Sequence, residues 1–202
     1  MAYNQFSLED VKQRLGVALR DQADLFAGVE PVEPSALLRE TLQDAAPIAL
    51  AFSTEKARSE LIIAPILLEV RRRHRGSIAL FSGAELNIDE SRGLTGYCDW
   101  LLARSPEQFA IEAPVLAVVE AKNENLRQGV PQCIAEMVGA QIFNERRGSR
   151  RVVFGAVTTG DVWRFLRLQG EQVDLDLTTY YLRELDRVLG VLVAMTGAGD
   201  EG

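Results

Sequence analysis

Two apolar segments joined by a short polar one constrain the fold of this chain more than any other feature. Residues Thr95 to Arg104 carry aromatic and aliphatic bulk, and Val115 to Lys122 is a nearly continuous apolar run. Such runs favour β-strands, and a continuous one is typical of a strand covered on both faces. Residues Ser105 to Pro114 include two prolines and several charged or polar residues, which predicts a loop. The sequence therefore predicts an antiparallel hairpin.

The pairing of this hairpin brings polar groups together. Opposite residues of an antiparallel pair have position numbers with a constant sum, so Asp99 faces Glu120 if Arg104 faces Val115. Side chains directly opposed have Cβ atoms roughly 4.5–5.5 Å apart. Lys122 follows Glu120 by two residues and so emerges on the same face, whereas Ala121 between them points away. A slip of one residue in register would put Asp99 on the face opposite Glu120.

Two carboxylates this close repel each other unless a cation lies between them. Hard carboxylate oxygens suit Mg²⁺ or Mn²⁺ rather than zinc, and a lysine beside them can hold or polarise an attacking water. The pair Asp99 and Glu120, with Lys122 alongside, therefore predicts a divalent-metal site. The alternative is an ordinary surface hairpin in which the lysine pairs with an acid across the strands.

A third acid lies on an apolar helical stripe. Residues Thr54 to Arg73 predict a helix, in which Glu60 shares a stripe with Ile63 and Leu67. A carboxylate there is costly unless it is paired or binds a metal. Pro65 lies inside the pattern and predicts a kink, because it lacks an N–H. The alternative for Glu60 is a place at the edge of the stripe, paired with an arginine.

Another helix is expected from Gly129 to about Arg146, with Pro131 in its first turn. Gln132 follows closely after the strand that carries Lys122, so it is placed to orient a phosphate or a water. The alternative is that Gln132 and Glu136, one turn apart, are two solvated polar residues.

The order of these residues resembles the PD-(D/E)xK nuclease superfamily, which has the restriction-endonuclease-like fold. The chain offers an acid on a helix, Asp99 on a strand, Glu120-x-Lys122 on the next strand and Gln132 on a helix. The segment Val152 to Phe165, with Thr-Gly-x-x-Trp inside it, resembles the hairpin that follows the core in the nuclease domain of type I restriction subunits. The N-terminal part resembles a family of small bacterial, notably cyanobacterial, proteins. Cys98 stands where the superfamily often has proline.

The resemblance implies a divalent-metal-dependent nuclease that hydrolyses phosphodiester bonds of nucleic acid, with DNA favoured. It implies that Asp99, Glu120 and the Ala121 carbonyl bind Mg²⁺ or Mn²⁺, that Glu60 is an auxiliary acid, and that Lys122 assists the water. Gln132 completes the expected catalytic set. The alternative is a non-catalytic nuclease-fold module that serves nucleic-acid binding or protein assembly.

The expected fold class is α/β, a restriction-endonuclease-like core with a mixed central sheet flanked by helices. Extra N-terminal helices and a C-terminal helix are added to this core. Residues 1–50 are expected to form a helical extension packed on the core, 51–196 the nuclease-like domain, and 197–202 a frayed tail. The further elements expected are helices at Ser7 to about Arg20, Ser35 to about Asp44 and Thr178 to about Met195, and a hairpin of Val152–Val157 with Val162–Leu168.

Composition restricts the partners and the chemistry. The formal net charge of −7 argues against strong nonspecific affinity for nucleic acid. Two arginine clusters, at residues 71–75 and 146–151, are placed to meet phosphates or, alternatively, to complement helix ends. His74 is the only histidine, which excludes histidine-based triads and leaves carboxylates to carry metal chemistry.

Other features indicate a cytoplasmic protein. No apolar run approaches the ~20 residues needed to cross a membrane. Met1 to Asp10 is polar and acidic, so no signal peptide is expected. Cys98 and Cys133 are expected to be free thiols. Leu192 to Met195 is apolar enough for a homodimer contact or for a place in the core.

Overall fold

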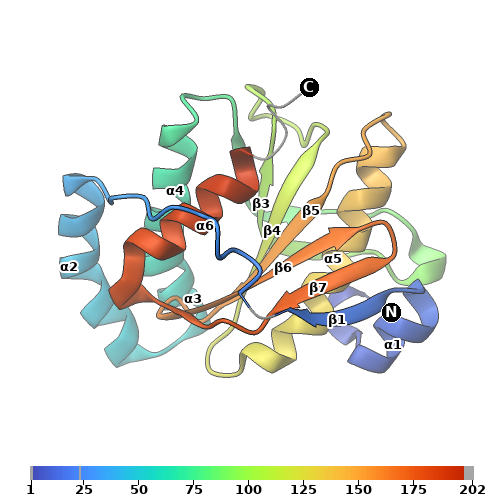
Figure 1. Ribbon diagram of the computed structural model, residues 1–202, viewed down its shortest axis with the longest axis horizontal. Helices are drawn as coiled ribbons and strands as arrows, with labels where there is room; N and C mark the ends of the chain where they lie inside the picture. Colours follow the sequence, from blue (N-terminus) through green and yellow to red (C-terminus); the bar gives the residue numbers. More distant parts are fainter. Residues whose placement is uncertain (1, 23, 198–202) are drawn as a thin grey trace.

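A mixed sheet of eight strands forms the centre of the protein (Figure 1). The computed structural model describes residues 2–22 and 24–197. Neighbouring strands follow the order β1-β7-β6-β5-β4-β3-β2, and β8 pairs with β6 beside this path. The strands are β1 (Ala18–Gln22), β2 (Ala79–Glu85), β3 (Tyr97–Ala103), β4 (Val115–Ala121), β5 (Val153–Thr158), β6 (Val162–Gln169), β7 (Gln172–Asp176) and β8 (Tyr180–Tyr181).

Helices cover both faces of the sheet, which confirms the predicted α/β class with a mixed, helix-flanked sheet. On one face α5 packs on β4 and β5, with α1 beside it; α2, α4 and α6 lie on the other face (Figure 1). A separate apolar core fills each interface. The helices are α1 (Leu8–Leu15), α2 (Ala36–Phe52), α3 (Glu55–Arg58), α4 (Ala64–Arg73), α5 (Leu126–Glu145) and α6 (Leu185–Gly197).

The hairpin of β3 and β4 has the register that the sequence predicted near its polar end. Trp100 pairs with Val119, and the next two pairs keep the same sum of positions. At the loop end the prediction was off by one residue, because Ala103 rather than Arg104 pairs with Val115. A bulge between Leu102 and Ala103 absorbs the difference, since a bulge sets two residues of one strand against one of the other. Continuing this register places Asp99 across from Glu120.

Strands β5 and β6 form the predicted hairpin and extend the sheet beyond β4. β5 runs parallel to β4 and sets Val157 beside Glu120. β6 returns antiparallel to β5 and sets Arg164 beside Val157. Side chains of directly paired residues point to the same face. Glu120, Val157 and Arg164 therefore form one row on the face that α5 covers.

The helix predicted from Thr54 to Arg73 is interrupted by a wide turn. α3 and α4 are joined by the π-helical segment Ser59–Ile63, in which the Ala64 amide donates to the Ser59 carbonyl five residues back. Pro65 has no N–H to donate, so the regular ladder is already broken at this point. The widened turn accommodates that break.

The N-terminal part differs from the prediction. α1 ends at Leu15 because Gly16 takes a left-handed conformation, with φ of +73°, and β1 follows where the helix was expected to continue. β1 pairs parallel with β7, so this part contributes a strand to the central sheet. α2 extends to Phe52 rather than Asp44, so the expected boundary at residue 50 falls within a helix.

Two later helices begin at other residues than predicted. α5 begins at Leu126, where the Asn125 side chain accepts the Arg127 amide, so Pro131 lies beyond the first turn. The last helix begins at Leu185, because Tyr180 and Tyr181 first pair with β6 as β8. The tail predicted from residue 197 lies almost wholly outside the described residues.

Leu192 and Met195 are buried in the core on the α6 side of the sheet, which is the second of the two roles that the sequence left open. No helix within the described ranges is both long and apolar enough to cross a membrane.

Candidate active site

Strands β3 and β4 and the helix α5 bring five polar side chains together. Asp99 comes from β3, Glu120 from β4, Lys122 directly follows β4, and Gln132 and Glu136 come from α5. The start of α5 can lie this close because residue 129 is glycine. A Cβ at Gly129 would lie 2.6 Å from the Val157 Cγ1 and 3.0 Å from the Lys122 Cγ.

Asp99 is anchored to the backbone beside Glu120. Its Oδ2 accepts a hydrogen bond from the Ala121 amide at 2.8 Å. A residue in a strand points its N–H and its C=O to the same side. The Ala121 carbonyl therefore faces the side on which Asp99 lies. On the side of β3 away from β4, the register of β2 sets Gly83 across from Asp99. Gly83 has a φ of +60°, and a Cβ at this position would meet no atom within 4 Å.

Glu120 is a buried acid, only 1% exposed. One carboxylate oxygen accepts a hydrogen bond from the Lys122 ammonium. The other accepts no hydrogen bond within the described residues. Burial, and after it the charge of Asp99, raise the pKa of Glu120 to about 8 against the opposing effect of Lys122. The acid thus sits where a positive charge would stabilise its ionised form.

Glu136 is a second buried acid, which the sequence left as a solvated polar residue. It is fully buried, and its Oε1 accepts the Gln132 Nε2 at 3.0 Å. Its Oε2 has no N–H or hydroxyl donor in the described part of the chain. Burial raises the pKa of Glu136, and the charge of Glu120 adds to the rise. The two raised pKa values have one main physical origin, since burial disfavours the ionised form of each carboxyl.

Lys122 contacts Glu120 directly and is connected to Glu136 through Gln132. Its Nζ contacts the Glu120 carboxylate and donates to the Gln132 Oε1 at 3.3 Å. Burial lowers the pKa of Lys122, but the Glu120 carboxylate outweighs this and the pKa is raised. The lysine therefore remains an ammonium. Gln132 lies between Lys122 and Glu136, as its predicted place near the site required.

Glu60 is not where the sequence placed it. Its side chain is 63% exposed and lies 3.7 Å from the Lys56 Nζ, one turn away. The π-helical turn is the reason, because the wider turn breaks the spacing that aligned Glu60 with Ile63 and Leu67. No contact joins it to the other predicted site residues in the part of the chain that the structure describes.

A different acid of the same helix influences the site. The charge of Glu55, in the first turn of α3, contributes to the raised pKa of Lys122. Helical periodicity favoured Glu60, and nothing in the local sequence distinguishes Glu55 from an ordinary first-turn acid. For the missed Glu136 the one available signal was its place one turn after Gln132; its burial follows from the packing of α5 on every side.

The arginine clusters are partly occupied by other contacts. The Arg73 Nη2 lies 2.8 Å from the Glu69 Oε1 and also donates to the Glu33 carbonyl. The Arg147 guanidinium lies 3.6 Å from the centre of the Phe143 ring. These contacts fit the alternative in which the arginines complement helix ends rather than bind phosphates.

The oxygen ligands available at the site suit a hard divalent cation that takes only part of its coordination from the protein. Asp99, Glu120 and the Ala121 carbonyl supply oxygen ligands, and one oxygen of buried Glu120 lacks a donor. In the described part of the chain no three His, Cys, Asp or Glu side chains are grouped as a metal site. Water would therefore complete the coordination. Burial raises the pKa of the Cys98 and Cys133 thiols, which argues against thiolate ligands.

Comparisons with protein-family models and with curated sequences give no match. The geometry of the site and the order of its residues along the chain therefore carry the functional evidence.

Proposed function

We propose that this protein is a divalent-metal-dependent phosphodiesterase that hydrolyses nucleic acid, with DNA favoured. The observation that carries the proposal is the buried Glu120 carboxylate, with Asp99 across the strand pair and Lys122 in contact. Burying an acid beside a second acid is unfavourable for the fold alone. A site that receives a cation gives this arrangement a purpose. The resemblance to PD-(D/E)xK nucleases, with their restriction-endonuclease-like fold, points the same way.

In this proposal Asp99, Glu120 and the Ala121 carbonyl hold Mg²⁺ or Mn²⁺. The bound ion would neutralise charge on the phosphate and lower the pKa of a water. Water attacks the phosphorus, the bond to the leaving oxygen breaks, and a proton passes to that oxygen. The Lys122 ammonium orients the attacking water and offsets the developing negative charge.

Gln132 and Glu136 support Lys122 rather than the phosphate. Gln132 accepts from the Lys122 Nζ and donates to Glu136, which restricts the position of the ammonium. Burial and the charge of Glu120 raise the pKa of Glu136, which favours its uncharged form beside Glu120. Both are positioning residues.

The second candidate is a non-catalytic module of the same architecture. Lys122 is already bonded to Glu120 and Gln132, as a purely structural ion pair would be. The net charge of −7 also favours a protein partner over nucleic acid. This candidate predicts no metal response and no cleavage.

Thermal unfolding in the presence of metal separates the two candidates. A cation that binds only the folded state raises the melting temperature by mass action. We expect millimolar Mg²⁺ or Mn²⁺ to raise the melting temperature of the parent protein and not that of Asp99→Ala. The exposed Asp44→Asn variant is the matched control and should respond like the parent. An absent shift in the parent would overturn the proposed site.

Cleavage of plasmid and single-stranded DNA tests the reaction itself. We expect metal-dependent nicking by the parent, and a loss of about 10²-fold or more in Lys122→Met. Lys56→Met removes an exposed lysine and should cleave like the parent. Equal cleavage by the parent and Lys122→Met would show that the activity does not belong to this site.

A further inference from the structure

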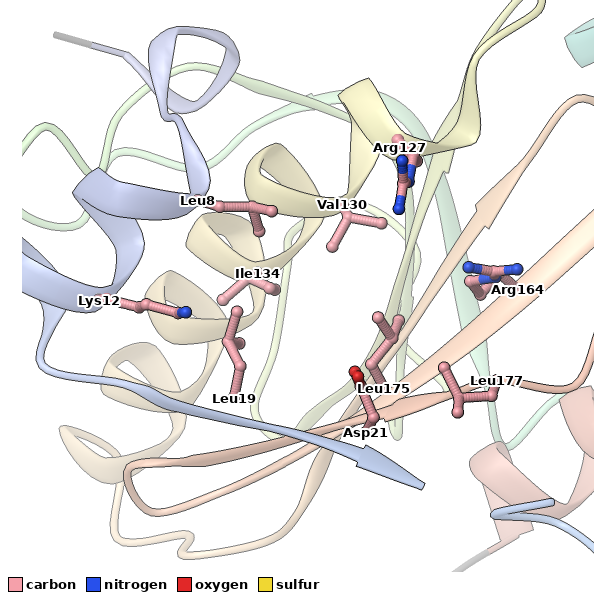
Figure 2. Close-up of a pocket in the computed structure, with 10 residues that line it drawn as sticks. All are labelled: Leu8, Lys12, Leu19, Asp21, Arg127, Val130, Ile134, Arg164, Leu175 and Leu177. Carbon is pink, nitrogen blue, oxygen red and sulfur yellow. The ribbon is translucent and has the colours of Figure 1, made fainter. Parts of the chain in front are cut away.

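A cavity of about 650 Å³ lies on the same face of the sheet as the candidate active site. It is bounded by α1, β1, α5 and the strands β6 and β7 (Figure 2). Its volume is within the range of roughly 300–1,000 Å³ that is usual for small-molecule sites. The apolar side chains that form its walls are Leu8, Leu19, Val130, Ile134, Leu175 and Leu177.

Three basic residues line this cavity, and none of them forms an ion pair with another described residue. Arg127 comes from the first turn of α5 and Lys12 from α1. Arg164 projects from β6, and its Nη2 donates a hydrogen bond to the Thr179 hydroxyl at 3.4 Å. The Arg164 Nε is buried and has no acceptor in the described part of the chain. Arg127 and Arg164 therefore form a positive end of the cavity, whereas Lys12 lies on the opposite side (Figure 2).

The positive end lies next to the candidate active site. Glu120 is beside Val157, and Val157 is beside Arg164, on three adjacent strands. Two strand spacings separate Glu120 from Arg164, or about 10 Å. Figure 2 shows Arg127, at the start of α5, and Arg164 on the same side of the cavity. Val157, between Glu120 and Arg164, is buried beneath Gly129, so Arg164 and Glu120 lie on either side of the contact between α5 and the sheet.

We propose that this cavity binds one nucleotide unit of a nucleic-acid strand. Its phosphate lies between Arg127 and Arg164, and its sugar and base pack against the apolar walls. Guanidinium groups suit phosphate because their N–H donors match its oxygens. The role of this unit as the neighbour of the cleaved phosphodiester rests on the proposed function; its binding to the cavity does not.

Asp21 distinguishes a nucleotide from other amphipathic anions. It lines the cavity from β1 and makes no ion pair with the described basic residues of the wall (Figure 2). A carboxylate repels a fatty acid or a second phosphate but accepts a hydrogen bond from a base N–H or a sugar hydroxyl. Apolar walls, a phosphate-binding end and one acceptor together correspond to the parts of a nucleotide.

Calorimetric titration with each of the four 5′-deoxynucleoside monophosphates, in EDTA, tests the proposal. We expect saturable binding of at least one of them to the parent protein. Arg164→Gln and Arg127→Gln should each weaken it by about tenfold or more. Arg127 is exposed, so its variant is expected to fold even if the half-buried Arg164→Gln does not. Arg150→Gln, an exposed arginine beyond the far end of α5, should bind like the parent.

Several results would overturn the proposal. These are no binding at millimolar nucleotide, equal binding by the parent and both arginine variants, and binding of inorganic phosphate or octanoate as tight as that of the nucleotide. The experiment is independent of the metal site. Nucleotide binding without any metal response would leave the cavity assigned and remove the proposed function. Metal-dependent cleavage without nucleotide binding would do the reverse.

Discussion

The Oδ2 of Asp99 lies 2.8 Å from the backbone nitrogen of Ala121 and accepts its hydrogen bond. An acid of β3 thereby takes the place of a backbone acceptor next to Glu120. The same bond fixes the strand end and holds a negative charge against a buried carboxyl. The Asp99 side chain therefore has a structural role, as acceptor of the Ala121 amide, and a proposed role as a metal ligand. Substitutions at this position can separate the two roles.

Asp99→Asn is expected to keep most of the stability and lose the metal response. The amide oxygen can still accept the Ala121 amide, but it brings no charge for a cation. Asp99→Ala should lose the metal response and also cost about 1–2 kcal/mol of unfolding free energy, because the amide loses its acceptor. Chemical denaturation with and without Mg²⁺ measures both effects. An Asn variant that responds to metal like the parent would contradict the role of the Asp99 charge.

Stability of the metal-free protein is expected to fall as the pH rises from about 4.5 to 8. The pKa of Glu120 is raised to about 8, so the folded state keeps a proton that the unfolded state has lost. The resulting slope is about 1.4 kcal/mol per pH unit for each proton retained, with the stability lost as pH rises through the folded pKa.

Glu136→Gln is the control for this pH dependence. The pKa of Glu136 is also raised, and the amide cannot ionise, so the decline of stability should be shallower in the variant. Denaturant midpoints at pH 5, 6.5 and 8 give the comparison. Identical slopes in the two proteins would show that Glu136 does not hold a proton. Mg²⁺ should flatten the decline further, since it favours the ionised acids.

Glu55→Gln and Glu60→Gln form a matched pair on neighbouring turns of one helix. The charge of Glu55 acts on Lys122, whereas exposed Glu60 pairs with Lys56. We expect a change of a few fold in metal-dependent cleavage for Glu55→Gln and none for Glu60→Gln. Initial cleavage rates at fixed Mg²⁺ measure this. A larger loss in Glu60→Gln would restore the role that the sequence alone suggested for Glu60.

Gly129→Ala is expected to destabilise the fold by about 1–3 kcal/mol and to disturb Lys122. The added methyl would meet Val157 at 2.6 Å and the Lys122 Cγ at 3.0 Å, so one of them must move. Gly28→Ala is the control, because its methyl would meet nothing within 4 Å. Thermal unfolding of both variants, with cleavage assays on the same samples, checks the expectation. Equal melting temperatures would mean that α5 adjusts freely over the site.

The sequence alone predicted the hairpin of β3 and β4 and the pairing near its polar end, although a bulge shifts the loop end by one residue. Those features are local, because the two strands follow each other in the chain and their apolar pattern restricts the register. It also placed Gln132 correctly near Lys122, since few residues separate the strand from α5.

Tertiary structure decided the rest of the site. Glu136 is buried because α5 is covered on all sides, which its own polarity does not reveal. Glu60 is exposed because the turn at Ser59–Ile63 is π-helical, and a pattern of regular helical spacing cannot anticipate such a turn. The pairing of β1 with β7 joins segments about 150 residues apart and depends on contacts that no local periodicity encodes. The cavity beside Arg164 exists only because that pairing closes one of its walls.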